Sequence, residues 1–193
     1  MDIEELGGTA DPASPPTGAA TLLEFWISAG PDKWFDKDED FDRILRERFL
    51  SWHEAATRGD LRVWAATPVG ALSLVLLLDQ FPRNAFRGTP RIYSSDALAR
   101  QAAATAIAAG HDRYFNGDLR GFFYMPFMHS ENIRDQDRSV ALHSDLSWEW
   151  QCPAYRHRDI IVRFGRFPHR NLILGRATTP EEQRFLEEGG FAG

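Results

Sequence analysis

The chain has 193 residues, 43% hydrophobic and 26% charged, which is ordinary for one globular domain that buries a full core. Its net charge of −6 at pH 7 excludes the strongly basic surface with which most nucleic-acid-binding domains hold phosphate. The one cysteine, Cys152, excludes an internal disulfide and a thiolate metal cluster, and no apolar run approaches the roughly 18 residues of a membrane span. We therefore expect a cytoplasmic protein that binds neither nucleic acid nor membrane.

In chain order, the sequence predicts a leader and then a series of helices. Residues 1–17 are rich in Gly, Ala, Pro, Ser and acidic residues, which predicts a flexible leader before a single domain over 18–193. Apolar residues at a 3.6-residue period then predict helices. These lie at about 18–28, 41–56, 68–80, 95–109, 116–128 and 131–148, followed by one from Pro153 and one from Thr179.

Several polar residues are expected to cap these helices. Asp36 and Glu39 have capping-box spacing before the second helix, and Thr179 begins a similar box before the last. Thr67 is expected to cap a helix that has Pro68 at its first position, and Ser130 is expected to cap a helix that begins at Glu131.

Prolines are expected to divide the helices. The helix over 68–80 is apolar nearly all round, which predicts a central position, and Pro82 is expected to end it. Pro126 should break the helix over 116–128, and Pro153 should open the next one. Because period-two alternation and hairpin signals are nearly absent, the predicted class is all-α. A helical bundle and a short superhelix of tetratricopeptide-repeat type both fit.

Several longer phrases carry a resemblance to a known family. They are Leu22–Trp26, Trp34–Phe35, Leu77–Asn84, Tyr124–Glu131, Arg163–Asn171, Leu174–Arg176 and Thr179–Glu182. From about residue 20 onward, the chain resembles the bacterial family called domain of unknown function 924. The resemblance implies an all-α fold similar to tetratricopeptide-repeat superhelices, and it implies no established reaction.

Most side chains that could carry chemistry gather between residues 157 and 176. Arg163, Arg166 and Arg170 are spaced three and four apart, and converging guanidinium groups suit a carboxylate or a phosphate. The alternative is that these arginines pair internally and hold helices together. The acids considered for such pairing are Asp79, Glu131, Asp135 and Asp159.

A second phrase repeats part of this pattern. Pro-Arg-Asn at 82–84 is similar to Pro-His-Arg-Asn at 168–171, which predicts two walls of one pocket. Arg83, Asn84 and Asn171 thereby join the candidate ligand-binding residues. The alternative for Arg83 is a structural pair with Asp79 at the helix end.

Three histidines, His129, His157 and His169, are the candidate acids or bases. A Ser-His-Asp triad through Ser130 lacks the Gly-x-Ser-x-Gly turn that usually presents such a serine, and no His-Glu-x-x-His pair marks a metal site. We predict neither a metal nor a cofactor.

Two functions of different classes remain open. The first is a pocket lined by Arg, His and Asn that binds a small anionic molecule bearing phosphate or carboxylate, with a histidine as acid or base. The second is a scaffold that holds an acidic peptide in a helical groove, with the arginines structural. Whether the protein is an enzyme is left open by the sequence.

Overall fold

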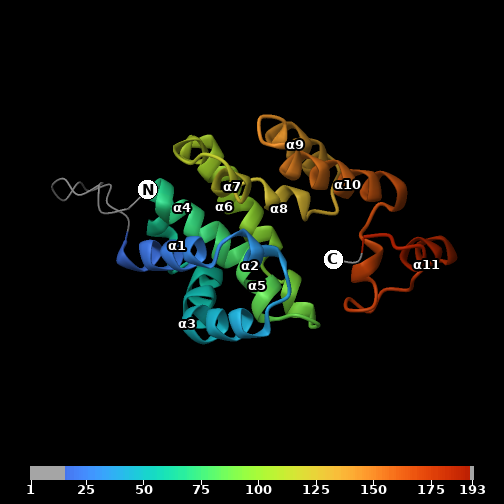
Figure 1. Cartoon of the computed structure of the whole chain (residues 1–193), viewed down its shortest axis with the longest axis horizontal. Helices are drawn as coiled ribbons and strands as arrows, with labels where there is room; N and C mark the ends of the chain where they lie inside the picture. The colour runs from blue at the N-terminus through green and yellow to red at the C-terminus, as the bar shows by residue number, and fades with distance from the viewer. Residues whose placement is uncertain (1–15, 192–193) are drawn as a thin grey trace.

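The computed structural model describes residues 16–191, and these residues form helices without a strand, which confirms the all-α class (Figure 1). The expected leader over 1–17 lies outside the described residues except for its last two, and Thr17 already begins a helix. The α-helices are α1 (Thr17–Ala29), α2 (Pro31–Phe35), α3 (Glu39–Arg58), α4 (Pro68–Val75), α5 (Phe81–Ala85), α6 (Asp96–Ala108), α7 (Asp118–Gly121), α8 (Met125–Met128), α9 (Ile133–His143), α10 (Trp148–Phe164) and α11 (Pro180–Glu187).

Shorter helical turns connect these elements. The 3-10 turns are η2 (Arg62–Ala66), η4 (Pro90–Tyr93), η5 (His111–Tyr114) and η6 (Pro168–Arg170), and the π turn is η3 (Leu76–Gln80). Among residues 16–191, no helix has the length and apolar character needed to cross a membrane.

The core is built around α4, as the apolar character of its sequence predicts. Helices α1 and α6 and the turn η2 pack against it. Leu72 and Val75 are completely buried there, as is Leu77 in the following turn. Full burial of one such side chain stabilises the fold by about 1.5–3 kcal/mol, so this helix anchors the domain.

Two of the predicted caps are present and two are misplaced. Thr67 accepts a hydrogen bond from the Gly70 amide, and Thr179 forms the predicted capping box. Asp38, not Asp36, caps α3, because Asp38 directly precedes the helix and accepts from the Phe41 amide. The expected cap at Ser130 is also wrong.

The segment after Ser130 begins its helix later than the sequence predicts. Asn132 is the N-cap of α9, and its side chain accepts from the Arg134 amide. The Ser130 hydroxyl instead donates to Asp135 at 2.6 Å. Helix α9 ends at His143, so the single helix expected over 131–148 is shorter than predicted.

The expected end at Pro82 is also wrong, because the helix runs on through the π turn η3 into α5. Pro82 has no N–H, so the carbonyl of Leu78 loses its helical partner. The Ser95 hydroxyl donates to that carbonyl at 2.6 Å, and His53 Nδ1 donates to the carbonyl of Leu77 at 2.8 Å. Side chains from other elements thus replace the missing backbone bonds.

Pro153 likewise lies inside a helix rather than at its start. Helix α10 begins at Trp148, and Pro153 falls in its second turn. Only the carbonyl of Glu149 loses a partner there, and Glu149 is exposed to water, so the interruption is tolerated. The segment over 116–128 forms two short helices, α7 and α8, with Pro126 in the first turn of the second.

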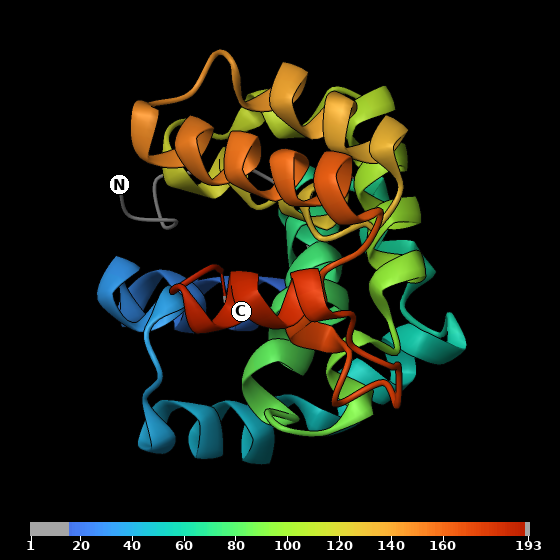
Figure 2. The ribbon, with the colours of Figure 1, turned by 90° about the vertical axis from the view of Figure 1, so that its right-hand side faces the viewer.

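The C-terminal segment, defined here as residues 165–191, lies beneath α10 in Figure 2. It shares a small apolar cluster with α10, in which Ile160, Ile161 and Phe167 are buried against Phe164 and Phe185. Helices α9 and α10 pack closely on each other above it. This arrangement places η6 next to the body of the domain.

Candidate functional site

The π turn brings a carboxylate against a histidine. Asp79 lies in η3 and His129 directly follows α8, and Nδ1 of His129 lies 2.9 Å from Oδ1 of Asp79. Both side chains are buried, with 1% and 8% of their surface exposed. A buried carboxylate that accepts from one ring nitrogen fixes both the orientation and the tautomer of the ring.

The charges around this pair favour an ionised aspartate and a neutral histidine. Burial would raise the pKa of Asp79, but Arg83 and His129 outweigh it and lower this pKa to about 2. Burial and the positive charge of Arg83 lower the pKa of His129, although Asp79 opposes them. Since Nδ1 carries the proton that Asp79 accepts, Nε2 of His129 has a free lone pair at neutral pH.

A cavity of about 500 Å³ opens beside His129, and most of its lining is polar. We call it the polar cavity; it is lined by Asp96, Arg100, His129, Ser130, Glu131, Asn132 and Arg170. Three elements that are distant in sequence meet there: α6, the segment before α9, and η6.

Arg170 is the most buried cation of the polar cavity, with 6% of its surface exposed. Its guanidinium lies 4.4 Å from the ring centroids of both Tyr93 and Phe167. Its one ion pair among the described residues joins Nη1 to Asp96 at 3.6 Å, and its Nε has no protein partner there. Burial lowers the pKa of Arg170, as expected for a cation with so little compensation.

Arg83 also forms an ion pair with Asp96. Its Nη2 lies 3.1 Å from Asp96, and its Nη1 lies 3.3 Å from Asp79. The predicted structural pair of Asp79 with Arg83 is therefore present. Arg83 takes the shorter contact to Asp96, so Arg170 is left with the longer one.

A second cavity, also of about 500 Å³, has His129 in its lining as well. We call it the apolar cavity. Its apolar and ring-bearing lining residues are Pro31, Phe35, Met125, Met128, His129, Trp150, Pro153, His157 and Phe191, with Asp118 and Glu149 as the carboxylates. His129 is the one residue that lines both cavities.

The three predicted histidines lie near one another. The ring centroids of His129 and His157 are 6.2 Å apart, and the ring of Phe191 lies 4.5 Å from His157 and 5.1 Å from His169. Burial is the main cause that lowers the pKa of His157 to about 3 and that of His169 to about 4. His157 Nδ1 donates to the Pro153 carbonyl at 2.8 Å. Among the described residues, His129 is the one of the three that is hydrogen-bonded to a carboxylate.

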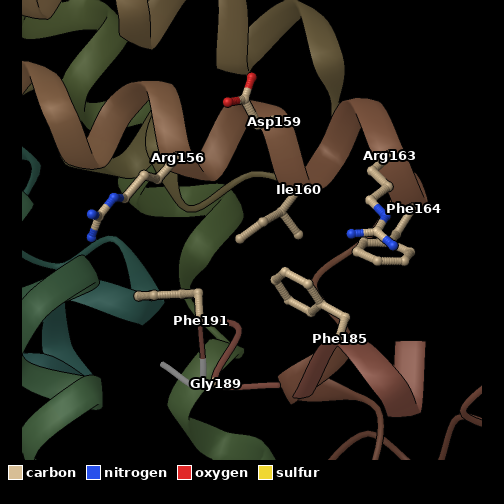
Figure 3. Close-up of a pocket in the computed structure, with 8 residues that line it drawn as sticks. All are labelled: Arg156, Asp159, Ile160, Arg163, Phe164, Phe185, Gly189 and Phe191. Atoms are coloured by element: carbon tan, nitrogen blue, oxygen red, sulfur yellow. The ribbon is translucent and has the colours of Figure 1, made fainter. Parts of the chain in front are cut away.

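The three arginines predicted to converge contact three different acids. Arg163 lies 3.0 Å from Glu181, and Arg166 lies 2.6 Å from Glu182, while Arg170 faces the polar cavity. Figure 3 shows Arg163 beside Phe164 and Phe185, in a separate cavity of about 440 Å³ between α10 and α11. The acids that bind Arg163 and Arg166 come from α11 and are none of the four acids that the sequence suggests as partners.

The two Pro-Arg-Asn phrases carry buried polar atoms that have no protein partner among the described residues. These atoms are Asn84 Nδ2, His169 Nδ1, Arg170 Nε and Asn171 Oδ1. Asn171 Nδ2 does donate to Glu182, at 3.3 Å. Because unpaired buried polar atoms are costly, a ligand or a water has to satisfy them.

Sequence reasoning missed other residues of the two cavities. Asp96 holds both Arg83 and Arg170, yet in the sequence it is only an acid at the start of a helix. Trp150 and Phe191 look like ordinary core or terminal aromatics. Among residues 16–191, no group of three or more His, Cys, Asp or Glu side chains is arranged to hold a metal ion.

Comparison with known proteins identifies the family. The model of the family described as bacterial protein of unknown function (DUF924) matches residues 22–190. A solved structure, that of a protein of unknown function from Agrobacterium tumefaciens, is similar with a TM-score of 0.87 and 53% sequence identity, over 89% of this chain and 97% of that chain. A search of curated proteins found no match. The chain therefore belongs to the DUF924 family, as the resemblance of its longer phrases predicts.

Proposed function

We propose that the polar cavity binds a small anionic molecule and that His129 exchanges a proton with it. The observation that carries this proposal is the position of Arg170, a buried and incompletely paired cation, in the same cavity as His129. A phosphate or carboxylate would supply the hydrogen-bond acceptor that Arg170 lacks among residues 16–191. A cavity near 500 Å³ is of the size that small-molecule sites have.

The proposed chemistry is acid–base catalysis without a covalent intermediate. Nε2 of His129 would accept a proton from the bound molecule, and the ionised Asp79 would stabilise the resulting imidazolium. The neighbouring hydroxyl of Ser130 donates to Asp135 and so does not face His129 as a nucleophile. His157 and His169 would keep their neutral rings around Phe191 and shape the surroundings.

The test is a thermal-shift series that compares sodium phosphate and sodium acetate with sodium chloride at matched ionic strength. A ligand that binds only the folded state raises the melting temperature by mass action. We expect phosphate or acetate to stabilise the wild type more than chloride does. In Arg170→Gln, this anion-specific stabilisation should disappear.

Arg166→Ala is the matched control, since Arg166 belongs to the same phrase but contacts Glu182. That variant should melt at a lower temperature yet keep the anion-specific shift. The proposal would be contradicted if the anion-specific rise in melting temperature were unchanged in Arg170→Gln. It would also be contradicted if all three salts had equal effects on the melting temperature of the wild type.

The alternative is a peptide-binding scaffold of tetratricopeptide-repeat type, in which the arginines only join helices. The ion pairs of Arg163 and Arg166 with α11 suit that role for these two residues. The scaffold would replace the small-anion proposal if an acidic hexapeptide bound more tightly than phosphate and did so equally well to Arg170→Gln.

A further inference from the structure

His129 lines two cavities of opposite character. One continuous segment contributes to both cavities. Met125 and Met128 line the apolar cavity, and Ser130, Glu131 and Asn132 line the polar cavity. His129, which lies between them in the chain, lines both. The segment therefore runs from an apolar wall to a polar wall within eight residues. A molecule lying along it would meet an apolar surface at one end and Arg170 at the other.

We propose that the ligand of this site is an amphipathic anion, with its charged group at Arg170 and an apolar chain or ring in the apolar cavity. This inference rests on the proposed function, because it takes the polar cavity as the place of the anion. The inference adds the class of substrate, which is a carboxylate or phosphate that carries a hydrocarbon part. The proton exchanged with His129 would then lie between the charged group and the hydrocarbon part.

The walls of the apolar cavity suit such a hydrocarbon part. The indole of Trp150 is held by a 2.7 Å hydrogen bond from Nε1 to Asp118, so its face is fixed. Met125 and Met128 are flexible side chains that adapt to different apolar shapes. His157 adds a neutral ring, because its Nδ1 is already bonded to the Pro153 carbonyl.

The rim of the cavity also exposes apolar surface that a ligand would cover. Phe35 is 53% exposed and Phe191 is 37% exposed, although both line the cavity. Covering these rings with a hydrocarbon chain would remove apolar area from water, which is the main source of affinity for such a chain.

The experiment is an NMR titration of the whole chain with straight-chain carboxylates, namely acetate, butanoate and hexanoate, and with neutral hexan-1-ol. Burial of each methylene corresponds to about a fourfold gain in affinity, so hexanoate should bind at least tenfold more tightly than acetate. Hexan-1-ol should bind more weakly than hexanoate, because it lacks the charge. Arg170→Gln should lower the affinity for all three carboxylates.

Phe35→Ala tests the apolar end, and Tyr114→Ala is its control, since Tyr114 is equally exposed at 52% and lies in neither cavity. The gain from acetate to hexanoate should shrink in Phe35→Ala and stay unchanged in Tyr114→Ala. The chain-length series on the wild type remains decisive even if Phe35→Ala does not fold.

The outcomes separate the two proposals. Acetate binding that depends on Arg170 but does not strengthen with chain length would overturn the amphipathic ligand and leave the anion site intact. Hexan-1-ol binding as tightly as hexanoate would show an apolar site independent of the charge and would also overturn it. If none of the three carboxylates bound to the wild type, that result would contradict the proposed function itself.

Discussion

The hydrogen bond between Asp79 and His129 defines the chemistry of the site at the scale of single residues. Burial and Arg83 lower the pKa of His129, and the carboxylate of Asp79 partly offsets them. We therefore expect Asp79→Asn to lower the pKa of His129 further, because the asparagine is uncharged.

Nitrogen NMR of the imidazole rings measures both this pKa and the tautomer. In the wild type, the proton of neutral His129 should reside on Nδ1. Asp135→Asn is a suitable control, because Asp135 contacts Ser130 and Arg100 rather than His129. A His129 pKa that is the same in Asp79→Asn as in the wild type would show that the carboxylate does not act on the ring.

Three histidines with strongly lowered pKa values predict how stability depends on pH. Burial lowers the pKa of His143 and that of His169 to about 4 and the pKa of His157 to about 3, whereas a histidine in the unfolded chain titrates near 6.5. As pH falls below about 6.5, the unfolded chain binds protons first, so stability is lost progressively until the folded-state pKa is reached. Asp79, with a pKa of about 2, stays charged through most of this window.

Urea unfolding at pH 7 and pH 5 measures the effect. We expect the free energy of unfolding to fall by on the order of 2 kcal/mol for each of these histidines. His157→Gln should reduce this loss, because glutamine does not titrate. The same loss in that variant as in the wild type would assign the pH dependence to other groups.

Single residues also show what the sequence could predict about the site. His129 and Arg170 are found because they stand in distinctive polar phrases. Asp96 is not found, since nothing in its neighbourhood shows that the fold will place it between Arg83 and Arg170. Arg163 and Arg166 look equivalent to Arg170 in the sequence and differ only through α11, whose packing no local pattern predicts.

At the scale of elements, the π turn η3 decides where Asp79 points. The rule that proline ends a helix predicts a stop before Pro82, and the rule fails because Ser95 and His53 satisfy the freed carbonyls. These bonds come from α3 and from the residue that precedes α6. The sequence pattern of η3 alone holds no sign of them, whereas the apolar character of α4 on all sides directly predicts its burial.

Ser95→Ala tests this account of the π turn. Without the hydroxyl, the carbonyl of Leu78 loses this partner, so we expect a loss of about 1–3 kcal/mol in the free energy of unfolding. Ser94→Ala is the matched control, because the neighbouring Ser94 is exposed and its hydroxyl donates to the carbonyl of Arg91 within the same turn. Urea unfolding of both variants gives the comparison, and equal stabilities would contradict the role assigned to Ser95.

At the scale of the whole molecule, polar contacts join the C-terminal segment to the body. Glu131 accepts a hydrogen bond from the Phe167 amide at 2.9 Å and contacts Arg176 at 2.8 Å. Asp96 reaches Arg170 from α6 in the same region. Because η6 supplies Arg170, these contacts also determine where the polar cavity has its cation.

Glu131→Gln should loosen this attachment, since the amide cannot form the ion pair with Arg176. We expect faster hydrogen exchange at the Phe167 amide while the amides of α4 keep their rates. Asp137→Asn, which removes an exposed ion pair between α9 and Arg158 of α10, is the control. Unchanged exchange at Phe167 would mean that the apolar cluster with α10 is sufficient to hold the segment.

The π turn also has a consequence for the evolution of the site. A single-residue deletion within Leu76–Gln80 could convert the turn into an ordinary α-helix and would rotate everything after it by about 100° relative to α4. Asp79 would then leave His129, while α4 could remain in the core. A related sequence with a one-residue gap at this position would therefore keep α4 in the core and lose the hydrogen bond between Asp79 and His129, so an alignment gap there would mark a change of chemistry.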